Sequence, residues 1–71
     1  MMTVASKAEA LFVSALQPSE NPQPAQVIAA IKVELERRGG CRGCAAECAA
    51  EFGHHPEAAI SRMRWALAKV A

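Results

Sequence analysis

Helix-breaking residues divide this chain of 71 residues into four stretches, and their positions constrain its fold more than any other feature. Three prolines lie in residues 17–24, a glycine pair occupies 39–40, and Gly53 precedes Pro56. Proline and glycine both disfavour the interior of a helix. The stretches between them are rich in alanine and poor in β-branched and aromatic residues, a composition that favours helices over strands. The sequence therefore predicts an all-α, small four-helix domain.

The bounds of the four helices follow from their apolar spacing and their end signals. Ser6 followed by Glu9 has the pattern of a capping box, which places the first helix start near Lys7. The predicted helices cover residues 7–16, 22–38, 42–52 and 56–70, and residues 17–24 form a proline-rich linker. A single domain accounts for the whole length.

The predicted core is thin, because much of the 52% apolar content is alanine. In the second helix we expect a buried stripe with Glu34 on the outer side; the stripe consists of Val27, Ile28, Ile31 and Leu35. The expected buried stripe of the fourth helix consists of Ala59, Ile60, Met63, Ala66, Leu67 and Val70. Trp65 falls on nearly the opposite side of that helix and is expected to project outward. So small a core makes dimerisation plausible.

Charge and hydropathy bear on the partners of the chain. Residues 1–36 hold two lysines and four glutamates, a charge of −2, and residues 37–71 hold five arginines, one lysine and three glutamates, a charge of +3. A basic C-terminal half suits a polyanion or an acidic protein surface. No run approaches the roughly 18 apolar residues of a membrane span, so we expect no membrane partner. The odd number of cysteines favours a reducing, cytoplasmic location.

The second half of the chain has the pattern of a helix-turn-helix motif. In this motif a small residue on the first helix allows the second helix to cross closely, and a glycine with positive φ forms the turn. Ala49 is the small residue, Gly53 stands four positions later, and Phe52 with Ile60 and Met63 supplies apolar contacts. The predicted architecture is therefore a four-helix domain with a helix-turn-helix-like C-terminal half.

Two resemblances accompany this motif. Residues 49–66 resemble the helix-turn-helix of the C-terminal DNA-binding region of bacterial sigma factors, with which they share the small residue, the Phe52-Gly53 pair, the nearby proline and the Ser-Arg-apolar step at 61–63. The whole chain also resembles a group of short all-helical actinobacterial proteins of uncharacterised function, which contain segments like 42–46, 52–57 and 62–66. The first resemblance implies a DNA-associated transcriptional regulator, and the second implies no particular activity.

If the motif binds duplex DNA, the fourth helix enters the major groove with its first residues near base edges. The expected reading positions are Glu57, Ala58, Ser61 and Arg62. Arg64, Lys69 and Arg42 are expected to contact phosphates, which fix position without reading sequence. Trp65 beside Arg62 would pack against sugar or protein.

A second hypothesis is a protein-interaction module. Tryptophan and arginine are enriched at binding hot spots. An outward Trp65 with Arg62, Lys69 and Val13 would therefore dock a protein partner or a second copy in a homodimer. Salt dependence separates the two hypotheses, since phosphate contacts weaken steeply with salt.

The cysteines and histidines raise a third hypothesis, a zinc-stabilised module. Cys41, Cys44 and Cys48 share one helical side, and His54 follows, so three thiolates and an imidazole are a chemically acceptable zinc set. Three ligands on one regular helix converge poorly, however, and Cys44 and Cys48 coincide with the apolar face of Phe52. Buried free thiols are therefore the favoured interpretation.

No catalytic pattern accompanies these residues. The sequence holds no phosphate-binding glycine loop, no serine triad and no orienting group for a Cys–His pair. We therefore expect a binding protein and no enzyme.

Overall fold

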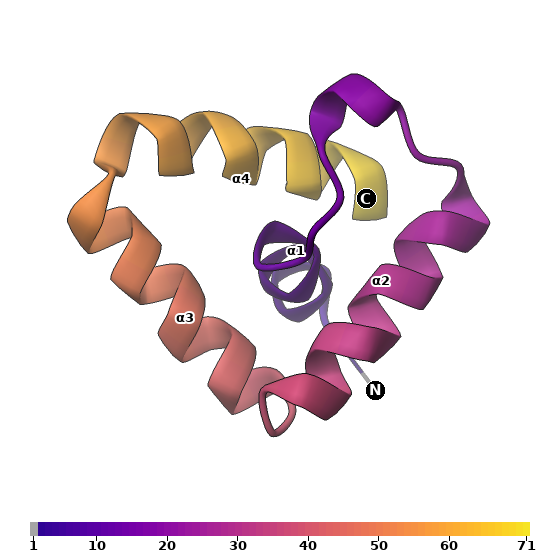
Figure 1. Cartoon of the computed structure of the whole chain (residues 1–71), viewed down its shortest axis with the longest axis horizontal. Helices are drawn as coiled ribbons and strands as arrows, with labels where there is room; N and C mark the ends of the chain where they lie inside the picture. The colour runs from indigo at the N-terminus through magenta and orange to yellow at the C-terminus, as the bar shows by residue number, and fades with distance from the viewer. Residues whose placement is uncertain (1) are drawn as a thin grey trace.

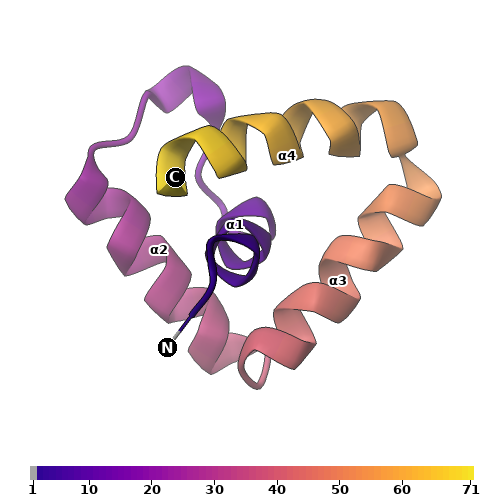
Figure 2. The same ribbon diagram turned by 180° about the vertical axis from the view of Figure 1, so that it is seen from behind.

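A helix from the beginning of the chain lies at the centre of three others. In the computed structural model, which describes residues 2–71, α1 (Val4–Phe12) is seen almost end-on inside a triangle of the other three (Figure 1). The sides of the triangle are α2 (Pro24–Arg37), α3 (Cys41–His54) and α4 (Pro56–Val70). The view from behind shows the same arrangement (Figure 2). The prediction of an all-α, four-helix domain is confirmed.

The central position of α1 explains its small side chains. Ala8, Ala10, Leu11 and Phe12 are all buried, and at about 100° per residue they spread over roughly half of the helix circumference. A helix on the surface buries a narrower stripe. Alanine allows the surrounding helices to approach closely, so the alanine-rich composition builds a core around α1 in place of a thin layer.

The start of α1 differs from the prediction. Thr3 is the N-cap, and its hydroxyl accepts a hydrogen bond of 3.0 Å from the backbone N–H of Ser6. The expected capping box at Ser6 and Glu9 is wrong, because Thr3 offers the same chemistry one turn earlier. The helix also ends at Phe12 instead of Leu16, and a 3-10 turn, η1 (Pro18–Glu20), occupies the proline-rich linker.

The buried face of α2 is rotated relative to the predicted stripe. Val27 and Ile31 are buried as expected, but Ile28 is 66% exposed and Glu34 only 2% exposed. Glu34 tolerates burial because the guanidinium groups of Arg37 and Arg38 lie 3.4 and 3.3 Å from its carboxylate oxygens. The ion pairs therefore allow Glu34, which was expected on the outer side, to be buried. The same rotation of the helix leaves Ile28 exposed.

The turn between α2 and α3 depends on two glycines. Gly39 and Gly40 have φ of +76° and +89°, a region that residues with a Cβ rarely adopt. The N–H of Gly40 donates a hydrogen bond of 2.7 Å to the carbonyl of Leu35, which ends α2, and Gly40 is also the N-cap of α3. Two helices thus meet at a sharp corner with almost no loop.

The corner between α3 and α4 is not the predicted glycine turn. Gly53 lies within α3 and has no positive φ, so the expected left-handed turn at Gly53 is wrong. Only His55 separates the two helices, and Pro56 occupies the first turn of α4. Ala49, the expected crossing residue, is exposed. Proline at the first helical position costs no hydrogen bond, which lets α4 begin directly.

The buried face of α4 is also rotated. Ala59 and Ala66 are buried as predicted, but Ile60 and Leu67 are 46% and 39% exposed. Trp65 packs against the core instead of projecting from the opposite side. The expectation of an outward Trp65 is therefore wrong.

Candidate functional site

Arg62 holds the C-terminal end of α1. Its Nε donates a hydrogen bond of 2.7 Å to the carbonyl of Phe12, and its Nη2 donates to the carbonyls of Ser14 at 2.9 Å and Leu16 at 2.8 Å. The last carbonyls of a helix lack partners within the helix and carry partial negative charge. Burial lowers the pKa of Arg62 from its ordinary value. One guanidinium on α4 therefore neutralises the end of the central helix.

Trp65 belongs to the same contact. The guanidinium carbon of Arg62 lies 4.9 Å from the centroid of the Trp65 ring, a cation–π distance. The indole Nε1 of Trp65 is buried and has no hydrogen-bond partner. The guanidinium of Arg62 is thus engaged within the chain, and docking of a partner on the Trp65 and Arg62 face stays a prediction.

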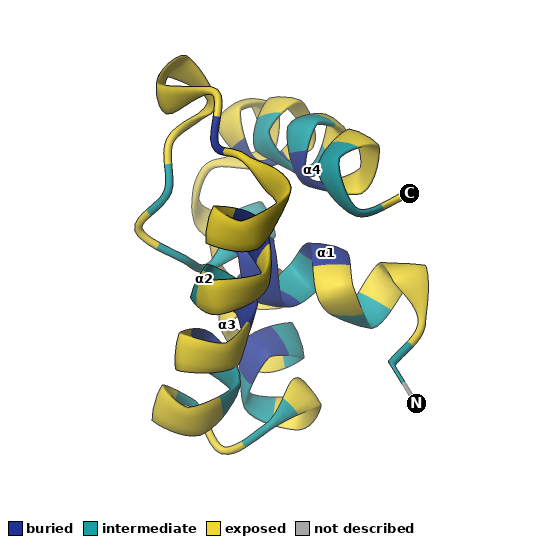
Figure 3. Ribbon diagram, turned by 90° about the vertical axis from the view of Figure 1, so that its right-hand side faces the viewer, coloured by how far each residue is buried: buried dark blue, intermediate teal, exposed yellow. Residues whose placement is uncertain are grey.

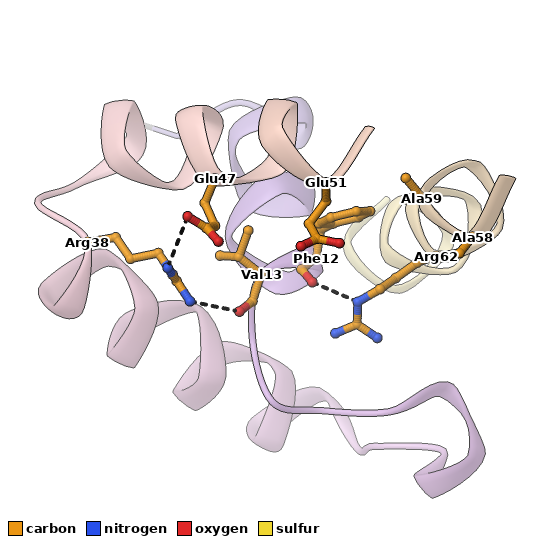
Figure 4. A pocket seen from close by; sticks show the side chains of 8 residues that line it. All are labelled: Phe12, Val13, Arg38, Glu47, Glu51, Ala58, Ala59 and Arg62. Carbon is orange, nitrogen blue, oxygen red and sulfur yellow. Dashed lines mark hydrogen bonds and ion pairs between the residues drawn. The ribbon is translucent and has the colours of Figure 1, made fainter. Parts of the chain in front are cut away.

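A cleft beside Arg62 contains a second arginine clamp (Figure 4). Arg38 lies 3.7 Å from the carboxylate of Glu47 and donates a hydrogen bond of 3.5 Å to the carbonyl of Val13. The cleft measures about 290 Å³, and its lining residues are Phe12, Val13, Arg38, Glu47, Glu51, Ala58, Ala59 and Arg62. Both arginines bind carbonyls at the C-terminal end of α1, Phe12 and the C-cap Val13, so we interpret these contacts as structural.

The other residues predicted to contact DNA lie along α4 and at the start of α3. Glu57, Ala58, Ser61 and Arg64 are exposed, and so is Arg42. Lys69 is half-buried and donates a hydrogen bond of 3.1 Å from Nζ to Oδ1 of Asn21. The exposed start of α4 thus presents the carboxylate of Glu57, which a DNA phosphate would repel. Contact of these residues with DNA stays a prediction.

The cysteines separate by burial. Cys41 is exposed, whereas Cys44 and Cys48 are buried beneath α1. Burial and then the Glu34 carboxylate raise the pKa of Cys44, and burial raises the pKa of Cys48 to about 11. His54 lies thirteen residues beyond Cys41, about 20 Å along the same helix.

The predicted zinc ligands are therefore not brought together. Within residues 2–71 no group of three or more His, Cys, Asp or Glu side chains is placed to hold a metal ion.

A groove along α2 was missed at the sequence level. One hollow of about 290 Å³ is lined by Met2, Lys7, Ile28, Ile31, Lys32 and Leu35. Another of about 220 Å³ is lined by Lys7, Pro24, Val27, Ile28, Ile31, Lys69 and Val70. The two share Lys7, Ile28 and Ile31, and together we call them the α2 groove. In Figure 3, α2 faces the viewer, and the two chain ends lie on the right, at the ends of α1 and α4. The groove escaped prediction because Ile28 was expected to be buried.

The comparisons with known proteins give no relative from which a role for these residues could be inferred. A scan against protein-family models, a search of curated proteins and a search of solved structures each found no match. None of the helices formed by residues 2–71 combines the length and the apolar character that crossing a membrane requires.

Proposed function

We propose that this chain is a protein-interaction module that binds an acidic, amphipathic helix of a partner in the α2 groove. One observation carries the proposal: the groove has an apolar floor, and its only charged lining residues are Lys7, Lys32 and Lys69. No aspartate or glutamate lines either hollow. An apolar floor with a basic rim is complementary to a helix that has an apolar face and acidic flanks.

The dimensions of the groove suit such an occupant. From Pro24 to Leu35 the α2 backbone covers about 17 Å, or three helical turns. Ile28 stands near the middle of this length and is 66% exposed, which is unusual for an isoleucine on an otherwise half-buried face. An apolar side chain at the centre of an interface is the position at which truncation costs most affinity.

A protein partner fits the described residues better than duplex DNA does. The guanidinium of Arg62, expected at a base edge, is bound to three backbone carbonyls. Glu51 and Glu57 flank the corner between α3 and α4. An apolar groove gains little from a phosphate backbone, whose binding depends on cationic contacts. DNA binding through α4 is therefore the rival outcome of the test.

The test is an NMR titration of the isotope-labelled chain with a designed peptide that forms an acidic amphipathic helix. A peptide of the same composition in scrambled order is the control ligand. We expect shifts at Ile28, Ile31, Lys32 and Leu35 with the helical peptide alone. Ile28→Glu is expected to weaken binding at least about tenfold, since a central hot spot is worth more than 1.4 kcal/mol.

Ile60→Glu is the matched control variant, because Ile60 is also exposed but lies on α4 outside the groove. It should bind the peptide as the unmodified chain does. Equal weakening by both variants, or no shifts in the groove, overturns the proposal. A parallel titration with duplex DNA at two salt concentrations separates the rival, for which salt-sensitive shifts would run from Glu57 to Lys69.

A further inference from the structure

The first turn of α3 carries two thiols with opposite exposure. Cys41 is the first residue of the helix and is exposed, whereas Cys44, three residues later, has no exposed surface. Arg42 and Gly43 separate them, in the order Cys-Arg-Gly-Cys. One thiol is thus accessible to a reagent in solution, and the other is shielded from it.

The spacing of the two cysteines permits a bond between them. Residues three apart on an α-helix have Cα atoms about 5 Å from each other, inside the range of about 4.4–6.8 Å that a disulfide requires. Cys41 is the first helical residue, so its N–H has no intrahelical acceptor and its backbone can adjust. Cys48 lies seven residues from Cys41, about 10 Å along the axis, and is out of reach.

The surroundings of Cys44 keep the pair in place. Its Sγ–H donates a weak hydrogen bond of 3.6 Å to the carbonyl of Glu34, on the last turns of α2. A Cβ at Gly43 would collide with the backbone carbonyl of Arg38, so the first turn of α3 is pressed against the end of α2. The first turn of α3 itself has no acidic residue, and the carboxylate of Glu34, which disfavours the Cys44 thiolate, belongs to α2.

From these positions we infer that Cys41 and Cys44 form a reversible dithiol–disulfide pair that exchanges with small-molecule disulfides. The inference is independent of the α2 groove. The exposed Cys41 acts as the attacking thiol, and the buried Cys44 as the resolving thiol. Cys48 stays reduced beneath α1.

The exchange balances in two steps. The Cys41 thiolate, its proton released to solvent, attacks one sulfur of a small-molecule disulfide, forms a mixed disulfide and expels one thiolate. The Cys44 thiolate then attacks the sulfur of Cys41, forms the internal disulfide and expels the second thiolate. Two electrons pass from the two protein thiols to the small disulfide, which is reduced to two thiols. Burial raises the pKa of Cys44, so the second step is expected to be the slower one.

The test is a peptide map of the unmodified chain after incubation with oxidised glutathione. Trypsin cuts after Arg38, Arg42 and Arg62, which places Cys41 on one peptide and both Cys44 and Cys48 on the next. A Cys41–Cys44 bond joins these peptides with the loss of two hydrogen masses, and a further cut after Glu47 leaves Cys48 on a separate, unlinked fragment. Dithiothreitol should restore both free thiols.

Two cysteine variants identify which thiols form the bond. Cys48→Ser should still form the joined peptides, and Cys44→Ser should stop at a glutathione adduct on Cys41. Circular dichroism checks that Cys44→Ser folds, and the map of the unmodified chain decides the question if it does not. A stable adduct on Cys41 of the unmodified chain, a Cys44–Cys48 bond, a disulfide-linked dimer or no reaction would each overturn the inference.

Discussion

The side-chain Nε of Arg62 donates a hydrogen bond of 2.7 Å to the carbonyl of Phe12, and this contact joins α4 to the end of α1 across fifty positions of sequence. The Nη2 of the same guanidinium reaches two further carbonyls beyond the helix end. A lysine could not supply this planar set of donors. Arg62 therefore acts as a structural clamp on the central helix.

The first prediction concerns this clamp. Arg62→Ala is expected to lower the free energy of unfolding by about 2–3 kcal/mol, because it removes charged hydrogen bonds to partly buried carbonyls. Arg64→Ala, an exposed neighbour on the same helix, should stay within about 0.5 kcal/mol. Urea unfolding followed by circular dichroism measures both. Equal effects of the two variants would contradict the clamp.

The second prediction compares two helical glycines. Gly53 has open space where a Cβ would stand, so Gly53→Ala should raise the free energy of unfolding by about 0.5–1 kcal/mol. In Gly43→Ala the new Cβ meets the backbone carbonyl of Arg38, which cannot move without displacing α2. We expect Gly43→Ala to lower the free energy of unfolding by at least about 2 kcal/mol.

Thermal unfolding of the two glycine variants also examines the predicted helix-turn-helix. If Gly53 formed a turn with positive φ, Gly53→Ala would be destabilising instead. A lower melting temperature for that variant would thus argue against the continuous α3.

The third prediction is a loss of stability at alkaline pH. In the unfolded chain the thiol of Cys48 ionises near its ordinary pKa of 9.0, whereas burial raises the folded-state pKa to about 11. Between these values the unfolded chain binds fewer protons, so the free energy of unfolding falls as pH rises. The contribution of Cys48 is fully present below pH 9 and is lost as pH rises through 11.

Cys48→Ala isolates this contribution. Its difference from the unmodified chain should be constant up to about pH 8 and should then shrink towards pH 11, because the variant has no thiol to ionise at this position. Urea titrations at a series of pH values under reducing conditions measure it. A difference that keeps its size through pH 11 would contradict the assignment.

The fourth prediction tests the core around α1. Leu11 has no exposed surface, and Leu11→Ala should cost about 3 kcal/mol through lost burial and the cavity that remains. Ile28→Ala truncates a similar side chain in the α2 groove and should stay within about 0.5 kcal/mol. Chemical unfolding of both variants provides the comparison. A large effect of Ile28→Ala would mean that this isoleucine is buried in solution.

The helix count was predictable because proline and glycine act locally, and the predicted fourth helix has the bounds of α4. The faces of the helices were less predictable. Periodicity assigned Ile28 to the interior and Glu34 to the surface, whereas the structure has them the other way round. The burial of Glu34 depends on its ion pairs with Arg37 and Arg38. The spacing of apolar residues along one helix carries no information about such a network of ion pairs.

The candidate site was predictable only in part. Sequence correctly marked Arg62 and Trp65 as neighbours, yet it gave no sign that Arg62 would find the free carbonyls at the end of α1. That acceptor set exists only because α1 stops at Phe12, four residues earlier than expected. The α2 groove likewise arises from three elements that are distant in sequence, and periodicity within one helix does not reveal it.

The central position of α1 has a consequence for cooperativity. Its apolar sides are covered only when α2, α3 and α4 are all in place, since α1 packs on each of them. Leu11 therefore gains its full burial late in folding, and the four helices are expected to unfold together in one transition.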